Sequence, residues 1–249
     1  MNSVEGKVIL VTGAARGIGA AIATRLSETA EALALTDIAD FDPSLPCEAH
    51  VVRGDLGDPT VPPRFFQETL ASFGRIDGLV NAAGLTTRGS FISPDAALFD
   101  RLFAVNTRAP FQLMGGAIAD MRARAAPGSI VNIQSMNAHG GAPDLAIYSA
   151  TKGALQTLTT NAAHAHLSDR IRVNGINLGW VDTETERQLQ EETLGKGAGW
   201  MAENAPKMPI GRYVSEDDAA RLARYLLSDD SAPMTGVSLD LEQIVMGGL

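Results

Sequence analysis

The sequence predicts an α/β fold in which a doubly wound parallel sheet of about seven strands carries helices on both faces. Two observations support this. Short apolar runs alternate with longer helix-compatible segments, and a glycine-rich turn follows the first run. Alternation of this kind implies parallel strands with right-handed crossovers. The expected strands are 7–11, 32–36, 49–52, 78–82, 129–134, 171–177 and 237–241, and the expected helices are 18–30, 62–73, 95–125, 149–168, 185–204 and 216–228.

One domain is expected over residues 1–249, because a chain of 249 residues with 45% hydrophobic content can bury one substantial core. No internal repeat, low-complexity tract or linker-like run divides the sequence. Cys47 is the only cysteine, which excludes an intrachain disulfide, and no His, Cys and Asp residues have the spacing of metal ligands.

The formal net charge of −9 argues against nucleic acid or an anionic membrane surface as a partner. No apolar stretch approaches the roughly 18 residues that are needed to span a bilayer. The first predicted strand begins almost at the N-terminus and leaves no room for a signal peptide. We therefore expect a cytoplasmic protein that acts on a small molecule.

The strand at 7–11 leads into Thr12-Gly13-Ala14-Ala15-Arg16-Gly17-Ile18-Gly19 and then into a helix. This order makes an anion site, because backbone N–H groups and the positive end of the helix can approach a pyrophosphate. We expect Gly13, Arg16, Gly17, Ile18 and Gly19 to bind a dinucleotide in a Rossmann-type sheet. The spacing Gly-x-x-x-Gly-x-Gly differs from the commonest dinucleotide fingerprint, however, and glycines also occur in ordinary turns.

Asp37 ends the next predicted strand, about 18 residues after Gly19. A carboxylate there can accept hydrogen bonds from a ribose 2′-hydroxyl and repels a 2′-phosphate, which predicts NAD as the cofactor. Arg16 argues mildly for the phosphate, and Asp37 can alternatively be a solvated acid at a strand end. The following segment, up to Asp55, contains prolines and little helical periodicity, so we expect a loop there.

Tyr148 and Lys152 are four residues apart on a predicted helix, and Ser135 ends the apolar run before it. A spacing of four places both side chains on one helix face. The ammonium group is expected to lower the pKa of the phenol, so that Tyr148 can exchange a proton with an alcohol or ketone. Chance surface pairs of Tyr and Lys are common, and Ser is an ordinary residue at a strand end.

Taken together, these motifs resemble the short-chain dehydrogenase/reductase family, in its form of about 250 residues, from Lys7 to Gly236. The resemblance implies that the loop from Thr12 to Gly19 cradles the pyrophosphate of the cofactor. It implies that Asp55 and Leu56 contact the adenine. It also implies that the turn Asn81-Ala82-Ala83-Gly84 steadies the central strand and passes beside a cofactor ribose.

The family's catalytic four fall on Asn106, Ser135, Tyr148 and Lys152. The resemblance gives Ser135 a hydrogen bond to the substrate oxygen, Tyr148 the proton and Lys152 a hydrogen bond to the nicotinamide ribose. Asn106 is implied to hold a water that links Lys152 to solvent, although Asn in a helical segment often marks only a kink.

The stretch from Asn177 to Thr183 resembles the segment of the family that binds the nicotinamide carboxamide, with Leu178 in place of the usual proline. It implies cofactor contacts for Val181 and Thr183. The glycine-rich region that follows, about 184–212, is expected to form a substrate lid. Asn137 and His139 should point toward a polyhydroxylated substrate, such as a sugar, polyol or sugar acid, although His139 can alternatively be an ordinary loop residue.

The leading hypothesis is an NAD(H)-dependent oxidoreductase that interconverts a secondary alcohol and a ketone by hydride transfer on a small polar substrate. One alternative is a carbonyl or 3-oxoacyl reductase that uses NAD(P)H. Another is a non-catalytic nucleotide-sensing protein that keeps the fold. The family mostly forms dimers or tetramers, so a homo-oligomer is expected.

Overall fold

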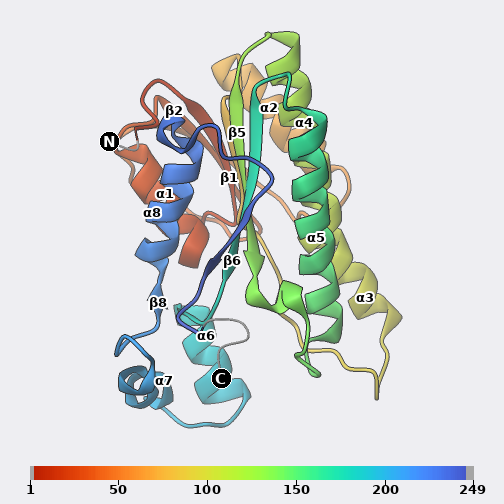
Figure 1. Ribbon diagram of the computed structural model, residues 1–249, viewed down its shortest axis with the longest axis vertical. Helices are drawn as coiled ribbons and strands as arrows, with labels where there is room; N and C mark the ends of the chain where they lie inside the picture. The colour runs from red at the N-terminus through yellow and green to blue at the C-terminus, as the bar shows by residue number, and fades with distance from the viewer. Residues whose placement is uncertain (1–2, 245–249) are drawn as a thin grey trace.

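The computed structural model of the protein describes residues 3–244, built around a seven-stranded sheet in the order β3-β2-β1-β4-β5-β6-β9 (Figure 1). All neighbouring strands pair in parallel. The switch point lies beside β1, where the chain order reverses. The strands are β1 Val8–Thr12, β2 Ala32–Asp37, β3 Glu48–Arg53, β4 Gly78–Asn81, β5 Gly128–Ser135, β6 Ile171–Leu178 and β9 Ser238–Leu241.

The predicted sheet is confirmed, and each expected strand lies within a few residues of an observed one. The reason is visible in the central strands. Every residue of β1 is buried, as a parallel strand covered on both faces requires, and its sequence is a continuous apolar run that ends in Thr12. A further pair of short strands, β7 Val181–Asp182 and β8 Val214–Ser215, lies outside the main sheet and was not expected.

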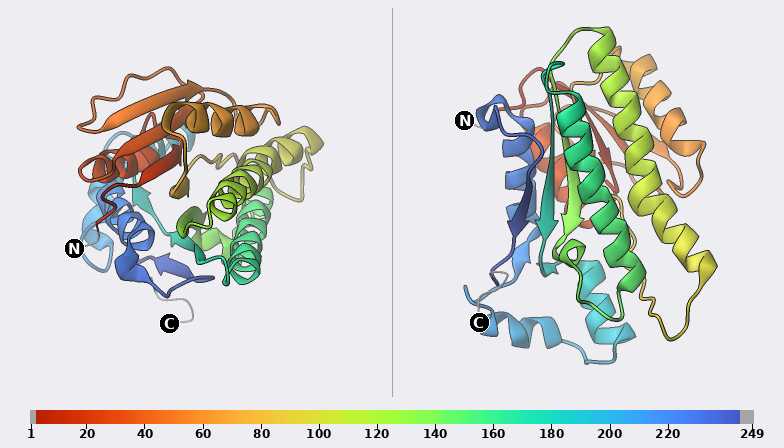
Figure 2. Two further views of the ribbon diagram at one scale, coloured as in Figure 1. Left: turned by 90° about the horizontal axis from the view of Figure 1, so that it is seen from above. Right: turned by 45° about the vertical axis from the view of Figure 1, so that its right-hand side comes forward.

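Helices cover both faces of the sheet, with α1 and α8 on one face and α2, α4 and α5 on the other (Figures 1 and 2). The buried residues divide into two clusters in the same way, one for each face. No helix within residues 3–244 is long and apolar enough to cross a membrane. The helices are α1 Gly17–Ser27, α2 Val61–Phe73, α3 Ala96–Phe103, α4 Ala109–Ala123, α5 Ala146–Ala165, α6 Glu184–Gln188, α7 Trp200–Asn204 and α8 Glu216–Leu227.

Two of the expected helices are interrupted. The segment predicted at 95–125 is α3 and α4 joined by a π-helical turn at Ala104–Arg108. The expectation of one helix over 185–204 is wrong: α6 and α7 are separate short helices. Glycines at 195, 197 and 199 lie between them, each with positive φ, a conformation that a right-handed helix cannot contain.

The loop predicted between Asp37 and Asp55 is confirmed up to the start of β3, since residues 38–47 contain no helix. Phe41, Leu45 and Cys47 from this loop pack against the core cluster beneath α1 and α8. These three side chains cover apolar core surface that a helix between β2 and β3 would otherwise cover.

A chain of buried amides connects β4 and β5 to α5. Asn81 Nδ2 donates to Asn132 Oδ1 at 2.8 Å, and Asn132 Nδ2 donates to Thr159 Oγ1 at 2.8 Å. Gln134 Nε2 donates to the same hydroxyl at 2.9 Å. Because buried polar groups are costly when unpaired, these bonds fix how α5 lies along β5.

We expect Gly175→Ala to destabilise the protein. A Cβ at Gly175 would lie 2.3–2.4 Å from the side-chain amide atoms of Gln134, which is buried and bonded to Thr159. Overpacking of this kind costs about 1–3 kcal/mol. Gly115→Ala, on α4 with nothing within 4 Å, is the control and should stabilise by about 0.5–1 kcal/mol. Urea unfolding measures both, and equal unfolding midpoints would contradict the packing argument.

Candidate functional site

The loop between β1 and α1 brings backbone into contact with backbone. Gly13 has φ of +69°, and a Cβ there would lie 2.9 Å from the Ala83 backbone. A Cβ at Gly19 would lie 2.0 Å from the Gly13 carbonyl oxygen. Thr12 Oγ1 accepts from the N–H groups of Ala82 and Ala83, both at 3.0 Å. The loop and the β4 turn are thus locked together at a spacing that only glycine permits.

The N-terminus of α1 is open toward this loop. Arg16 occupies the N-cap position without a side-chain cap bond, and the first turn contains no acidic residue. The first N–H groups of a helix have no partner within the helix. Those of Gly17, Ile18 and Gly19 therefore present donors and partial positive charge to an anion.

Asp37 faces the same loop from the end of β2. Its Oδ2 accepts from the Ala15 N–H at 3.0 Å and its Oδ1 from the Ala39 N–H at 3.0 Å. These two bonds hold the carboxylate at the rim of the cavity described next. Arg16 also lines that rim, and no hydrogen bond or ion pair of its side chain occurs among residues 3–244 that the structure describes.

A cavity of about 250 Å³ opens between the loop, the β4 turn and α3. Most of the predicted cofactor residues line it, but Asn81, Tyr148, Lys152 and Val181 are not among the lining residues. Asn81 points inward to Asn132, and Val181 packs in the core because its backbone pairs with β8. The lining residues are Gly13, Arg16, Gly17, Ile18, Gly19, Asp37, Ile38, Gly54, Asp55, Leu56, Ala82, Ala83, Gly84, Leu85, Arg101, Val105 and Thr183.

Arg101 is a lining residue that no sequence motif indicated. Its Nη1 bonds both carboxylate oxygens of Asp55, at 2.8 and 2.9 Å. Burial raises the pKa of Asp55, but the bonds from Arg101 and from the Gly57 N–H outweigh it and hold the pKa below its usual value. The predicted adenine contact is therefore an ion-paired carboxylate. The sequence could not predict this ion pair, because Arg101 on α3 is far from Asp55 along the chain and belongs to no recognisable motif.

Tyr148, Lys152 and Ser135 meet where β5 ends against the first turns of α5. Lys152 Nζ lies 5.8 Å from the centroid of the Tyr148 ring and donates to the Ile133 carbonyl oxygen at 2.8 Å. Tyr148 and Ser135 both line the cavity described below, and the interaction with Ser135 lowers the pKa of the phenol. A Cβ at Gly84 would lie 3.5 Å from Lys152 Nζ, so the ammonium group borders the first cavity.

Burial shifts both pKa values away from their usual positions. Burial raises the pKa of Tyr148, the interaction with Ser135 lowers it, and the charge of Glu186 raises it again, for a net increase. Burial also lowers the pKa of Lys152 from 10.5 to about 8. The expectation that Tyr148 has a lowered pKa is therefore wrong, because loss of solvent outweighs the favourable interactions for a phenol this deeply buried.

Asn106 lies on the π-helical turn and is fully buried. Its Oδ1 accepts from the Leu85 N–H at 2.8 Å, and its Nδ2 donates to the Leu85 carbonyl at 2.9 Å and to Thr151 Oγ1 at 3.1 Å. The side chain thus satisfies the backbone N–H and carbonyl of Leu85 in the loop after β4, and connects this loop to α5. Its place on the π-helical turn agrees with the alternative that an Asn in a helical segment marks a kink.

A second cavity, of about 360 Å³, lies on the other side of Tyr148. Ser135 and Asn137 line it as predicted. His139 does not: its Nε2 lies 3.2 Å from Asp240 Oδ1 at the end of β9. Glu186, Gln190 and Glu242 line the cavity without having been indicated by the sequence. The full lining is Thr86, Arg88, Ser135, Met136, Asn137, Leu145, Tyr148, Leu178, Gly179, Trp180, Glu186, Leu189, Gln190 and Glu242.

Thr183 joins the two cavities. It lines the first, and its Oγ1 accepts from the Glu186 N–H at 3.0 Å as the N-cap of α6. The same helix carries Glu186 into the second cavity. The start of α6 therefore contributes to the walls of both cavities, through Thr183 in the first and Glu186 in the second.

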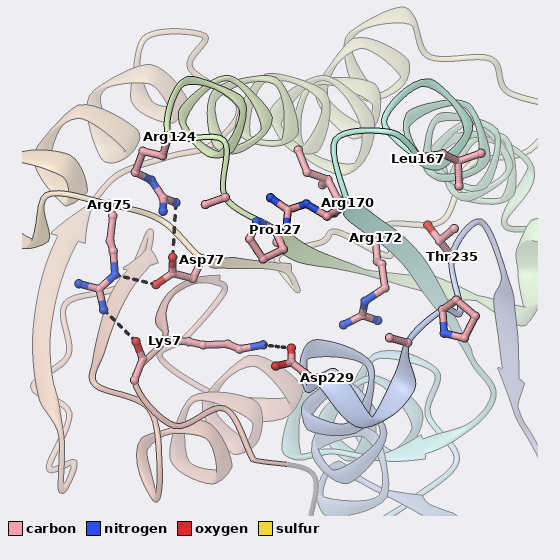
Figure 3. A pocket seen from close by; sticks show the side chains of 16 residues that line it. Lys7, Arg75, Asp77, Arg124, Pro127, Leu167, Arg170, Arg172, Asp229 and Thr235 are labelled. Atoms are coloured by element: carbon pink, nitrogen blue, oxygen red, sulfur yellow. Dashed lines mark hydrogen bonds and ion pairs between the residues drawn. The ribbon is translucent and has the colours of Figure 1, made fainter.

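A further cavity, of about 640 Å³, lies at the opposite end of the sheet, where the strands begin (Figure 3). Its basic side chains already have partners. Lys7, Arg75 and Arg124 are ion-paired with acids, and Arg170 and Arg172 donate to main-chain carbonyls. These cations stabilise the surrounding strand and helix ends, and none of the predicted site residues lies among them.

A family model described as Enoyl-(Acyl carrier protein) reductase matches residues 13–243. The 2-(S)-hydroxypropyl-CoM dehydrogenase 3 of Xanthobacter autotrophicus is 32% identical, over 97% of each chain. The solved L-sorbose reductase of Gluconobacter frateurii, complexed with NADPH and L-sorbose, superposes with a TM-score of 0.91 at 25% identity, covering 100% of this chain and 99% of that one. The solved short-chain dehydrogenase/reductase of Serratia marcescens superposes with a TM-score of 0.84 at 31% identity. The match covers 96% of this chain and 98% of that one.

The low pKa of Lys152 predicts a pH-dependent stability. Below about pH 8 the folded protein keeps a buried charge and bears its full cost; between about 8 and 10.5 the unfolded state binds more protons, so stability rises with pH. Lys152→Met should therefore be more stable than the wild type at pH 7, by about 2–3 kcal/mol.

This advantage should shrink toward pH 10.5, which urea unfolding at several pH values can measure. Lys207→Met, at an exposed lysine, is the control and should show no such trend. A constant difference between Lys152→Met and wild type across the range would show that Lys152 is not destabilised by burial.

Proposed function

Because the chain belongs to the short-chain dehydrogenase/reductase family, we propose that it is an NAD(H)-dependent oxidoreductase that interconverts a secondary alcohol and a ketone. The observation that carries the proposal is the position of Tyr148. Its side chain lines the second cavity together with Ser135, and Lys152 lies beside its ring and next to Gly84 of the first cavity. A proton donor in the wall of the second cavity, with Lys152 toward the first, suits a reaction between a cofactor and a small substrate.

The residues of the first cavity fit a nicotinamide dinucleotide. Backbone N–H groups at the start of α1 would hold the pyrophosphate, and the close contact of Gly13 with the β4 turn leaves that face of the loop free of side chains. Asp37 would accept from the adenosine ribose, Asp55 and Leu56 would contact the adenine, and Thr183 would bind the carboxamide. The bound nicotinamide supplies the hydride chemistry.

The protein's own residues would manage the proton. Ser135 would hold the substrate oxygen, and Tyr148 would donate a proton to a ketone or accept one from an alcohol. Its raised pKa keeps the phenol protonated near neutral pH, which suits the donor role. Lys152, largely charged at neutral pH, would hydrogen-bond the ribose and stabilise the phenolate when it forms. Asn106, which bonds both Leu85 and Thr151, would hold the loop after β4 in a fixed position relative to Lys152 on α5.

The substrate would be a small polar compound such as a sugar or polyol. The second cavity offers hydroxyl, amide and carboxylate groups from Ser135, Asn137 and Gln190, together with Glu186 and Glu242. The similar solved enzyme whose name is L-sorbose reductase was complexed with a sugar, which agrees with this choice. The segment 184–212 would act as the lid.

A carbonyl reductase that uses NADPH is the alternative that a specific observation favours. Arg16 lines the cofactor cavity close to Asp37, and a guanidinium there can pair with a 2′-phosphate. The solved L-sorbose reductase contains NADPH. Asp37 argues against it, since its carboxylate is held by two backbone N–H groups at the position where the 2′ oxygen would lie.

A homo-oligomer also remains a proposal, supported by exposed apolar side chains before α3 and on α4. Phe91 and Ile92, which precede α3, are 89% and 95% exposed, and Phe111 on α4 is 59% exposed. Single exposed apolar residues are common, but a group of this kind often marks a contact surface.

Tyr148→Phe tests the mechanism. The ring and its packing remain while the exchangeable proton is lost, so turnover should fall by about 10²–10⁴ with little change in cofactor binding. The assay is NADH formation at 340 nm with a panel of sugars, polyols and simple alcohols. In the wild type, oxidation should accelerate as pH rises, because Tyr148 must lose its proton. Unchanged turnover by the variant would favour a non-catalytic or differently catalysed role.

Asp37→Ser tests the cofactor preference. It removes the carboxylate and leaves Arg16 in place, so kcat/KM with NADP relative to NAD should rise by about 10- to 100-fold. Asp40→Ser is the matched control, since Asp40 pairs with Arg53 outside the cavity. A wild type that already prefers NADP strongly would refute the role given to Asp37.

A further inference from the structure

Two carboxylates face the substrate cavity, and the mechanism uses neither of them. Glu186, on α6, lies close enough to Tyr148 for its charge to act on the phenol. Its Oε1 accepts from Trp180 Nε1 at 2.8 Å and from Gln190 Nε2 at 2.6 Å. Within residues 3–244 no hydrogen bond or ion pair of Oε2 occurs, which leaves that oxygen as an acceptor.

Glu242 reaches the same cavity from the end of β9. Its Oε2 accepts from the Trp180 N–H at 3.2 Å, and a Cβ at Gly179 would lie only 1.9 Å from that oxygen. The glycine therefore makes room for the carboxylate. Neither acid is paired with a basic side chain in the described part of the chain, so both are available to accept hydrogen bonds from a ligand.

The positive charges nearby do not neutralise this pair. Arg88 also lines the cavity, but its Nη1 lies 3.4 Å from Asp144 Oδ2. Lys196 Nζ bonds Gln190 Oε1 at 2.6 Å and lies 3.8 Å from the centroid of the Trp200 ring, and it does not line the cavity. Lys152 is committed to the Ile133 carbonyl on the cofactor side. The substrate cavity is therefore acidic.

We propose that Glu186 and Glu242 determine substrate specificity, so that the cavity accepts neutral polyhydroxylated or amine-bearing compounds and rejects anionic ones. An ionised carboxylate only accepts hydrogen bonds, and hydroxyl and ammonium groups are the donors it requires. A substrate carboxylate would instead meet two like charges. The inference rests on the proposed function and removes sugar acids from the expected substrates.

Three probes with one six-carbon skeleton but different charge test this: sorbitol (neutral), gluconate (anionic) and glucamine (cationic). The chain contains 2 tryptophans, and their ring centroids are 5.5 Å apart, with Trp180 in the cavity wall. Intrinsic fluorescence at pH 7 therefore reports binding to the cofactor-free enzyme without any turnover. Initial rates with saturating NAD provide a second, independent measurement.

We expect the wild type to bind glucamine and sorbitol at least about 10-fold more tightly than gluconate, the size of one charge repulsion at a partly solvated site. Glu186→Gln and Glu242→Gln keep the size of the side chain and remove the charge, so each should reduce the discrimination several-fold. Glu192→Gln, at an exposed position on the same lid outside the cavity, should leave the discrimination unchanged.

Equal binding of gluconate and sorbitol by the wild type overturns the proposal, as does full discrimination in both cavity variants. A lack of fluorescence response to all three probes also counts against it. Failure of the proposed function looks different: the charge order appears in the fluorescence titration, but Tyr148→Phe leaves NADH formation on an accepted alcohol unaffected.

Discussion

The docking of α5 on β5 is the contact on which the site depends. Thr159 accepts from both Asn132 and Gln134, and these bonds are buried. In a dry interior an unpaired amide is expensive, so α5 has one favourable position along the strand. That position sets Tyr148 and Lys152, which α5 carries, against Ser135, which ends β5. The position of Tyr148 is thus decided several turns away from it along α5.

Close backbone approach is the second constraint, and it acts on the cofactor side. Gly13 lies against Ala83, and Gly19 lies against the Gly13 carbonyl. The absence of side chains there joins the loop to the β4 turn and exposes the first N–H groups of α1. Gly179 serves the substrate side differently, because it admits the Glu242 carboxylate into the cavity wall. In each case the absence of a Cβ creates space for a neighbouring group in the wall of a cavity.

Burial has opposite effects on the two central titratable groups and moves their pKa values apart. It raises that of Tyr148 and lowers that of Lys152 to about 8. The cost of holding an ammonium group with one carbonyl partner is paid in folding stability. In return, a phenol that holds its proton lies beside an ammonium group that can lose its proton more easily than usual. Such an arrangement is common at functional sites and rare in an ordinary core.

The sequence by itself determined the strand positions, the glycine loop, Asp37 and the grouping of Ser135, Tyr148 and Lys152, because apolar periodicity and motif spacing are local properties of the chain. Tertiary structure alone decided that Asn81 points inward, that His139 pairs with Asp240 and that Arg101, Glu186 and Glu242 converge on the cavities. It also reversed the expected pKa shift of Tyr148. Charge interactions and solvent exposure depend on which distant residues the fold brings together, and spacing along the chain does not contain that information.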